Sequence, residues 1–424
     1  MSEILMDELI SSKDIFLLIK DTLSLYDERP MNHGMQSAYI LYNLLKARGG
    51  YEEYEIVDIC FVALLQDVGI YKTEYLNIKG DYETADISKH SVYGYLMFRY
   101  LSPYPDYAKM LLYHHVHWDR LQGVNYAHKD LAQFLHISSD AASIIARVGK
   151  RFSLTKMIET RSDKYMPEVV KLFQKVMMNG QITVDLLNGD YEEKMKKVWD
   201  YALLSDTEKS KLSDILMFSI GFRDEVSVMK AIASVYACRE IGSHMKLTEE
   251  DREALDCAAI LHDIGMLSIP SSIISAPRQL TKEERAIVRT HVDVTRELIT
   301  PYVPARVADI ACAHHERFDG SGYPLGLKGG KMNDLQAILQ VADTVAALIN
   351  ARTYAGSLTN EEICTILLED ADNQKLNKMV VDTTVVYFDQ MMKRIKPEMD
   401  KIRETYLALK SRLEEQVQAG NKLT

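Results

Sequence analysis

LDCAAILHDIG (Leu255–Gly265) is a mostly apolar segment that ends with a histidine, an aspartate and a glycine. On both sides of it, apolar residues recur at helical spacing almost throughout the chain, and the 10 prolines and 20 glycines leave little room for low-complexity linkers. This pattern predicts helices rather than strands. We therefore expect an all-α fold, and 424 residues are enough for two or three domains with a core of their own.

His262 and Asp263 begin a series of potential metal ligands that extends over about eighty residues. RTHVDVTRELI (289–299) contains His291, and ILQVADTVAALINARTY (338–354) contains Asp343. Between them, HHERFDGSGYP (314–324) places two adjacent histidines beside an acid and a glycine-rich turn. Imidazole and carboxylate groups are common ligands of transition metals, so the series indicates a metal site carried by helices or helix ends.

The same series occurs in the first half of the chain, in the segments FVALLQDVGIYKTE, KHSVYGYLMFRYL, LLYHHVHWDR and FLHISSDAASIIARVGKRF. Corresponding residues are 196 to 203 positions apart: Gln66 and His262, His90 and His291, His114 and His314, and Asp140 and Asp343. Such constant offsets predict a tandem pair of domains that arose by duplication. The expected bounds are 1–215 for the first copy with its helical tail, 216–396 for the second copy, and 397–424 for a C-terminal helix.

Each copy lacks one imidazole. The first copy has Gln66 at the position of His262, and the second copy has Met229 at the position that corresponds to His33. Two interpretations of the first copy remain open: its polar residues bind a metal, or they are hydrogen-bonded core groups in a copy that has lost its site. The residues concerned are His33, Asp67, His90, His114, His115 and Asp140.

The bulk composition narrows the class of protein. A net charge of −11 argues against a protein that coats nucleic acid or a membrane surface. The five cysteines have no paired spacing, which is typical of reduced thiols, and no apolar run has the length of a membrane span. We expect a cytoplasmic protein that binds neither a membrane nor a nucleic-acid polymer.

At these motifs the second copy, roughly residues 222–390, resembles the HD-GYP family of bacterial cyclic-dinucleotide phosphodiesterases, within the HD phosphohydrolases. The first copy, roughly 20–150, looks like a degenerate relative without the Gly-Tyr-Pro turn. The resemblance implies two tandem HD-type helical bundles that pack on each other. It also implies a metal-dependent phosphodiesterase that converts cyclic di-GMP or cyclic GMP-AMP to the linear dinucleotide or to mononucleotides.

The resemblance further implies two or three divalent transition metals, and the absence of cysteine from the ligand set favours Fe or Mn. The ligands would be Glu225, His262, Asp263, His291, His314, His315 and Asp343. Asp263 would be the bridging, catalytic carboxylate between two ions about 3.5–4 Å apart. Glu225 would hold a third ion, since it lies one helical turn before Met229.

Substrate contacts are expected from the Gly-Tyr-Pro turn and from nearby cations: Arg317, Gly322, Tyr323, Pro324, Lys328, Lys331 and Arg352. Met266 and Ala346 stand where the family usually has lysine and aspartate. With Met229 they favour an alternative, a non-catalytic protein that binds a cyclic dinucleotide or a partner protein. A third interpretation, a phosphohydrolase of mononucleotides, fits the turn less well. The charged C-terminal helix would face solvent or a partner, which includes a second copy of the chain.

Overall fold

The structure is a computed structural model, and it describes residues 9–72, 87–220, 225–274, 276, 278–350, 352–353 and 356–420. These residues are mainly helical, which confirms the all-α prediction. Their strands are two residues long each, β1 (Arg352–Thr353) and β2 (Gly356–Ser357), and they pair antiparallel with Arg352 opposite Ser357. The chain divides into two compact units, which we call the N-terminal unit (12–211 with 409–424) and the C-terminal unit (1–11 with 212–408).

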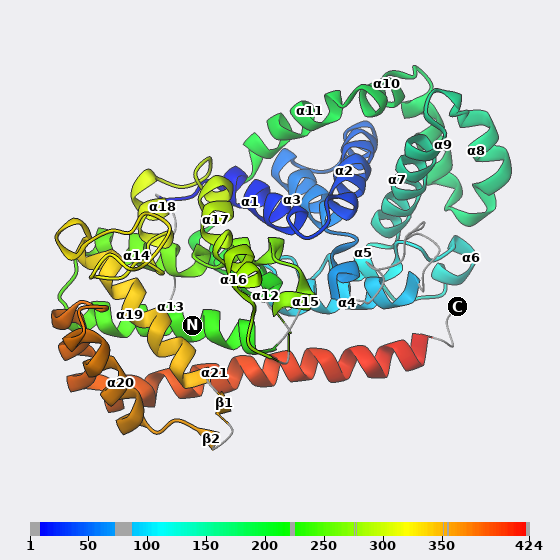
Figure 1. The fold of residues 1–424 in the computed structure, drawn as a ribbon. Coiled ribbons are helices and arrows are strands. Elements are labelled where there is room, and N and C mark those ends of the chain that lie inside the picture. Colours follow the sequence, from blue (N-terminus) through cyan, green and yellow to red (C-terminus); the bar gives the residue numbers. More distant parts are fainter. Residues whose placement is uncertain are drawn as a thin grey trace. The chain divides into compact units, whose positions relative to one another are not determined.

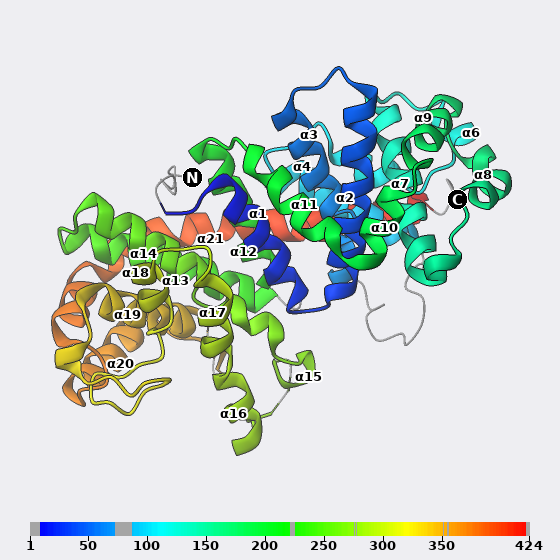
Figure 2. The ribbon, with the colours of Figure 1, turned by 90° about the horizontal axis from the view of Figure 1, so that it is seen from above.

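The helices of the N-terminal unit are α1 (Ser12–Ser24), α2 (Glu28–Arg48), α3 (Glu53–Leu64), η1 (Val68–Lys72), α4 (Ile87–Leu101), α5 (Ala108–Tyr113), α6 (Trp118–Leu121), α7 (Lys129–Val148), η4 (Gly149–Arg151), α8 (Leu154–Arg161), η5 (Ser162–Lys164), α9 (Pro167–Met177), α10 (Gln181–Asn188), α11 (Asp190–Val198) and η6 (Trp199–Tyr201). Here α marks an α-helix and η a 3₁₀-helix. Helix α2 packs against α3 and α7 (Figure 2). A Cβ on Gly34 of α2 would lie 1.9 Å from the carbonyl oxygen of Leu64, so glycine permits the close approach of α2 and α3.

The helices of the C-terminal unit are α13 (Glu225–His244), α14 (Glu249–Leu261), η7 (Ile264–Ser268), α15 (Ser271–Ile274), α16 (Lys282–Arg289), α17 (His291–Ile299), α18 (Ala305–Ala311), η8 (Gly329–Lys331), α19 (Asp334–Asn350) and α20 (Asn360–Asp372). Helix α13 packs along α19 and α14, and α14 also contacts α18 (Figure 1). The buried residues between these helices are mostly small or aliphatic, such as Ala233, Val341 and Ala342. Small side chains allow close helix packing, which brings the polar residues of these helices together.

Two helices contribute residues to both units: α12 (Asp206–Ile220) and α21 (Lys378–Gly420). The sequence prediction placed a separate C-terminal helix from residue 397, whereas α21 begins at Lys378 and continues through Pro397. Proline removes one backbone hydrogen bond, but Ile395 and Met399 are buried on either side of it, and this packing maintains the helix. In the described part of the chain, every helix is too short or too polar to span a membrane.

Candidate metal centre

The backbone of the C-terminal unit brings the predicted ligands to one place. His262 caps the C-terminus of α14, Asp263 precedes η7, and His291 begins α17. A Cβ on Gly265 would lie 2.1 Å from the carbonyl oxygen of His291, so glycine lets η7 approach the start of α17. The glycine of the HDIG motif therefore fixes the distance between Asp263 and His291.

Asp263 lies between two groups of ligands. Its Oδ1 atom is 3.3 Å from Nε2 of His291 and 3.4 Å from Nε2 of His314. Together with His315 these residues form a first group whose ligand atoms lie within 4.8 Å of one another. His262, Asp263 and Asp343 of α19 form a second group, in which Nε2 of His262 is 3.3 Å from Asp263 Oδ2 and 3.4 Å from Asp343 Oδ1.

Hydrogen bonds to the backbone orient three of these imidazoles in the same way. The Nδ1 atoms of His262, His291 and His314 lie 2.7, 2.6 and 2.7 Å from the carbonyl oxygens three residues earlier in the chain. A carbonyl oxygen can only accept, so Nδ1 donates, and each Nε2 faces the cluster. This outer bond is typical of metal-binding histidines, because it fixes both the tautomer and the ring orientation. The Nε2 atom of His262 is buried beside the carboxylates of Asp263 and Asp343. The donor set therefore fits divalent metal ions.

Lys230 is the residue of this centre that the sequence analysis missed. Its ammonium nitrogen lies 3.0 Å from Asp263 Oδ2 and 2.8 Å from Asp343 Oδ1. Burial would lower the pKa of this lysine, but the two carboxylates outweigh that effect and raise it. The same ammonium holds the pKa of both carboxyl groups well below the usual range, against the effect of their burial. Lys230 therefore occupies the space between the carboxylates of the second ligand group.

The assignment of Met229 as the counterpart of His33 is corrected by these contacts. His33 Nδ1 lies 2.7 Å from Asp67 Oδ2, and it is Lys230 that makes the equivalent contact in the C-terminal unit. Met229 is buried and 1 % exposed. Consecutive residues of a helix point about 100° apart, so a one-residue difference in the spacing decides which side chain faces Asp263.

The Gly-Tyr-Pro loop forms one wall beside the cluster. The buried carboxylate of Glu316 accepts hydrogen bonds from the backbone N–H groups of Leu325 (2.7 Å) and Leu327 (2.8 Å), and so holds the loop at two points. A Cβ on Gly322 would lie 2.2 Å from the backbone nitrogen of Arg317, so the turn requires glycine there. The ring of Tyr323 lies 4.8 Å from that of His315 and 4.7 Å from the guanidinium group of Arg289.

A cavity of about 290 Å³ adjoins the cluster in the C-terminal unit. It is lined by Ser227, Lys230, Asp263, Met266, Ile274, Val288, His291, His315 and Tyr323. The cavity therefore combines candidate metal ligands and a cation with an apolar and aromatic side, which is a common composition of ligand sites.

The remaining predicted residues are placed as follows. Lys328 and Lys331 are not among the described residues that line the cavity, and both side chains are exposed. Arg317 and Pro324 are partly buried in that loop. The side chains of Glu225 and Arg352 lie outside the described part of the structure.

Ala346 and Met266, which depart from the family pattern, lie in different surroundings. Ala346 is fully buried in α19, among the core residues. Met266 lines the cavity and is partly exposed. The cavity therefore has a thioether at the position where the family usually has a lysine.

Comparisons with known proteins agree with this architecture. A family model described as HD domain matches residues 220–380. The chain is 23% identical over 396 residues to 3'3'-cGAMP-specific phosphodiesterase 1 of Vibrio cholerae, which covers 89% of this chain and 91% of that protein. It is 37% identical over 122 residues to the cyclic di-GMP phosphodiesterase response regulator RpfG of Xanthomonas campestris. This match covers 28% of this chain and 32% of that protein.

Among solved structures, a cyclic GMP-AMP specific phosphodiesterase of V. cholerae (V-cGAP3) matches with a TM-score of 0.57. The match covers 90% of this chain and 98% of that chain at 15% sequence identity, so it concerns the fold alone. The ligand cluster of the C-terminal unit lies wholly within the segment that the family model matches. Residues 220–380 of the chain, which contain this cluster, are therefore similar to the HD domain family.

Proposed function

We propose that the chain is a metal-dependent phosphodiesterase that hydrolyses a cyclic dinucleotide. One observation carries the proposal: Asp263 faces two groups of metal ligands at once, and the cavity beside them is walled by Tyr323. A shared carboxylate between two metal positions is the arrangement used to hydrolyse phosphate esters. The names of the relatives, which are cyclic-dinucleotide phosphodiesterases, support the same conclusion.

Bound divalent metal ions supply an activated water and neutralise charge on the phosphoryl oxygens. Fe and Mn fit the nitrogen and oxygen donors, and cysteine is absent from the ligand groups of the described residues. Asp263 would join two ions, with His291, His314 and His315 on one side and His262 and Asp343 on the other. We also propose that Glu225 holds a third ion.

Lys230 makes the two metal positions unequal. The ammonium group lies between Asp263 and Asp343, so an ion in the second position has to displace it, whereas the first position contains no such cation among the described side chains. Displacing an ion-paired lysine costs free energy, and we expect the second position to bind its ion more weakly. When the lysine stays in place, its charge also faces the cavity in which a phosphate would lie.

The wall of the cavity suits a nucleotide. Ile274, Val288 and the ring of Tyr323 offer apolar and aromatic surface to a base, and Arg289 adds a cation above that ring. The proposed phosphate contacts are Arg317, Gly322, Pro324, Lys328, Lys331 and Arg352. Cyclic di-GMP and cyclic GMP-AMP both remain candidate substrates, and the relative that matches most of the chain bears the name of the second.

Turnover of both cyclic dinucleotides tests the proposal. The anaerobically purified chain is assayed with added Fe(II) or Mn(II), beside Asp263→Ala and a matched control, Asp293→Ala, whose exposed side chain lies on α17. We expect hydrolysis by the wild type and the control and its loss in Asp263→Ala, with the linear dinucleotide or mononucleotides as the product.

A second candidate is a non-catalytic protein that binds a cyclic dinucleotide or a partner protein. Met266 in the cavity and Ala346 in the core favour it, because both replace residues that the family usually has. Binding of a cyclic dinucleotide without turnover, under each metal tried, would support this candidate and contradict hydrolysis.

We also propose a cytoplasmic location, packing of the two copies on each other, and self-association through the C-terminal helix. Analytical ultracentrifugation of the full chain, beside a chain that ends at residue 408, tests the self-association.

A further inference from the structure

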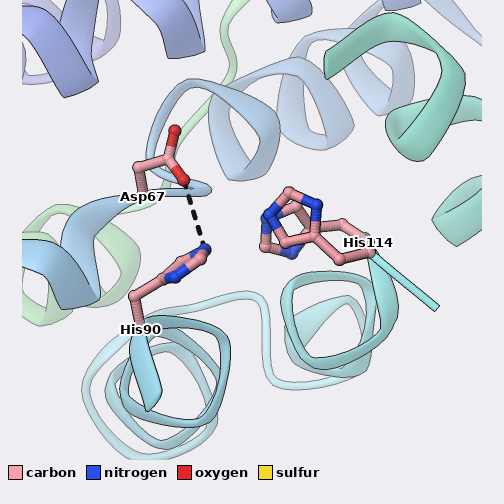
Figure 3. Close-up of side chains that lie close together, drawn as sticks. Asp67, His90 and His114 are labelled. Atoms are coloured by element: carbon pink, nitrogen blue, oxygen red, sulfur yellow. Dashed lines mark ion pairs between the residues drawn. The ribbon is translucent and has the colours of Figure 1, made fainter. Parts of the chain in front are cut away.

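A second cluster of metal-ligating side chains lies in the N-terminal unit, and we call Asp67, His90, His114 and His115 the N-terminal cluster. Each residue offers one ligand atom, and these atoms lie within 4.8 Å of one another. Asp67 follows α3, His90 lies on α4, and the two adjacent histidines follow α5. Figure 3 shows Asp67, His90 and His114 converging from these elements, with the 3.4 Å ion pair between Asp67 and His90. We propose that the N-terminal cluster binds one divalent transition-metal ion.

The orientation of His114 points to such an ion. Its Nδ1 atom lies 2.6 Å from the carbonyl oxygen of Leu111, so Nδ1 donates and Nε2 carries a lone pair. The side chain is fully buried, and Nε2 has no hydrogen-bond partner. A buried polar atom without a partner is unfavourable, and a metal ion would satisfy this one. His314 makes the same Nδ1 bond in the C-terminal unit, to Ala311.

A glycine sets the spacing of the N-terminal cluster, as Gly265 does in the C-terminal unit. A Cβ on Gly69 would lie 2.1 Å from the carbonyl oxygen of His90, the distance found between Gly265 and His291. In both units the glycine follows the aspartate by two residues and lets a 3₁₀-helix approach the helix that carries the histidine. The N-terminal unit has therefore kept the backbone geometry that places an aspartate beside three imidazoles.

The second metal position is closed by side chains in the N-terminal unit. His33 Nδ1 lies 2.7 Å from Asp67 Oδ2, and His33 Nε2 lies 2.9 Å from the hydroxyl oxygen of Ser143. Gln66, which stands where the other unit has His262, donates to Ser37 through its side-chain amide. His33 therefore holds one oxygen of Asp67 and leaves the other oxygen, Oδ1, for the N-terminal cluster.

Asp140, the expected counterpart of Asp343, takes no part in the cluster. It accepts hydrogen bonds from Arg161 (3.0 Å) and from the hydroxyl group of Tyr165 (2.5 Å). With Asp140 and His33 both engaged, one ion fits the N-terminal unit rather than two. Such an ion would join the end of α3 to α4 and α5, and it would stabilise this unit.

Metal content measured on the full chain tests the proposal without reference to phosphodiesterase activity. The C-terminal ligand groups are disabled with the double variant Asp263→Ala/His314→Ala, and the chain is loaded with Mn(II), desalted and measured by mass spectrometry. We expect about one ion per chain in this variant and a loss to near zero when Asp67→Ala and His114→Ala are added. His117→Ala, an exposed histidine three residues from His114, is the matched control and should keep the ion.

Co(II) provides an independent readout. In the double variant it should give visible absorption bands of a nitrogen- and oxygen-ligated ion, which the added Asp67 and His114 changes abolish. No bound ion in a double variant that retains wild-type circular dichroism would overturn the proposal. Should that variant fail to fold, Asp67→Asn/His114→Gln in the wild-type background decides: a drop of one ion per chain supports the proposal, and an unchanged count refutes it. Inactivity towards cyclic dinucleotides would leave both results unaffected.

Discussion

At the scale of single residues, a different basic side chain faces the central aspartate of each unit. Asp263 directs one oxygen to His291 and His314 and the other to Lys230, and Asp67 divides its oxygens between His90 and His33. A lysine and a histidine thus take equivalent positions. In the N-terminal unit, Gln66 replaces the second histidine and Asp140 is bound to Arg161 and Tyr165, so the two units differ at more than this one side chain.

Replacing Lys230 with alanine should destabilise the metal-free protein and strengthen metal binding at the second position. Without metal, two buried carboxylates lose their partner, and we expect the free energy of unfolding to fall by about 3 kcal/mol. The second metal position should bind Mn(II) about tenfold more tightly, because no ammonium has to be displaced. Calorimetric titration with Mn(II) and chemical denaturation measure both effects, and Lys282→Ala, an exposed lysine, is the control. Unchanged affinity would contradict this role of Lys230.

Asp58 on α3 gives the N-terminal unit a pH-dependent stability. Burial is the main cause that raises the pKa of its carboxyl group; the hydrogen bond from Tyr104 (2.8 Å) lowers the pKa, Glu208 and Glu55 raise it, and the net value is about 7. The pKa in the unfolded chain is about 3.9, so the folded state binds more protons between pH 4 and 7. Stability should therefore fall as the pH rises through this range, and level off above it.

Asp58→Asn removes the charge and keeps an acceptor for Tyr104. We expect the variant to be more stable than the wild type by about 1–2 kcal/mol at pH 8, a value reduced for the partial exposure of the carboxylate. The advantage should shrink steadily towards pH 4. Denaturation curves at several pH values, with the exposed Asp106→Asn as the control, test the sign of this dependence.

At the scale of elements, glycines and one buried glutamate position the parts of the candidate site. Gly265 sets how closely η7 approaches α17, and Gly322 lets the Gly-Tyr-Pro turn fold back on Arg317. Glu316 then fixes the loop through Leu325 and Leu327. These backbone contacts set the positions of the side chains that face the cavity, although most of the contacts themselves lie outside the cavity.

Glu316→Gln should loosen the loop. An amide offers one acceptor atom where the carboxylate offers two, and its NH₂ group would face a backbone N–H. We expect the free energy of unfolding to fall by about 1–3 kcal/mol and the amides of Leu325 and Leu327 to exchange hydrogen at least about tenfold faster. Glu297→Gln, at an exposed site on α17, should change neither property. Unaltered exchange at both amides would show that the carboxylate does not hold the loop.

At the scale of the whole molecule, each unit brings together ligands from distant parts of its sequence. Asp263 and Asp343 are separated by several helices, and so are Asp67 and His114. Metal ions bind such ligands in the folded state and not in the unfolded chain, so they stabilise the fold. Both units should therefore depend on metal for part of their stability.

Removal of metal by a chelator should lower the melting temperature of the wild type. An ion whose free concentration is a hundred times its dissociation constant adds about 2.7 kcal/mol to the free energy of unfolding. For a unit of this size, that raises the melting temperature by roughly 5–10 °C. Addition of Mn(II) should restore the melting temperature. In Asp67→Ala/Asp263→Ala the chelator should have no effect, and a persisting shift there would place the stabilising ion elsewhere in the chain.

The helical fold and most members of the two candidate metal clusters could be predicted from the sequence. The helical spacing of apolar residues and the repeated HD, His and His-His motifs are local features, so they could be read along the chain before any contact was known. The HDIG and GYP motifs, together with their order, also predicted which half would carry the fuller ligand set.

Only the packing of the helices determines which side chains near the sequence motifs face the candidate metal centre. Lys230 rather than Met229 meets Asp263, because one residue of spacing rotates a helical side chain by about 100°. Asp140 binds Arg161 and Tyr165 instead of joining its cluster, and Glu316 was recognised as the anchor of the loop through its contacts. These contacts join residues far apart in the chain, and the packing of helices sets them, so no local pattern in the sequence could reveal them.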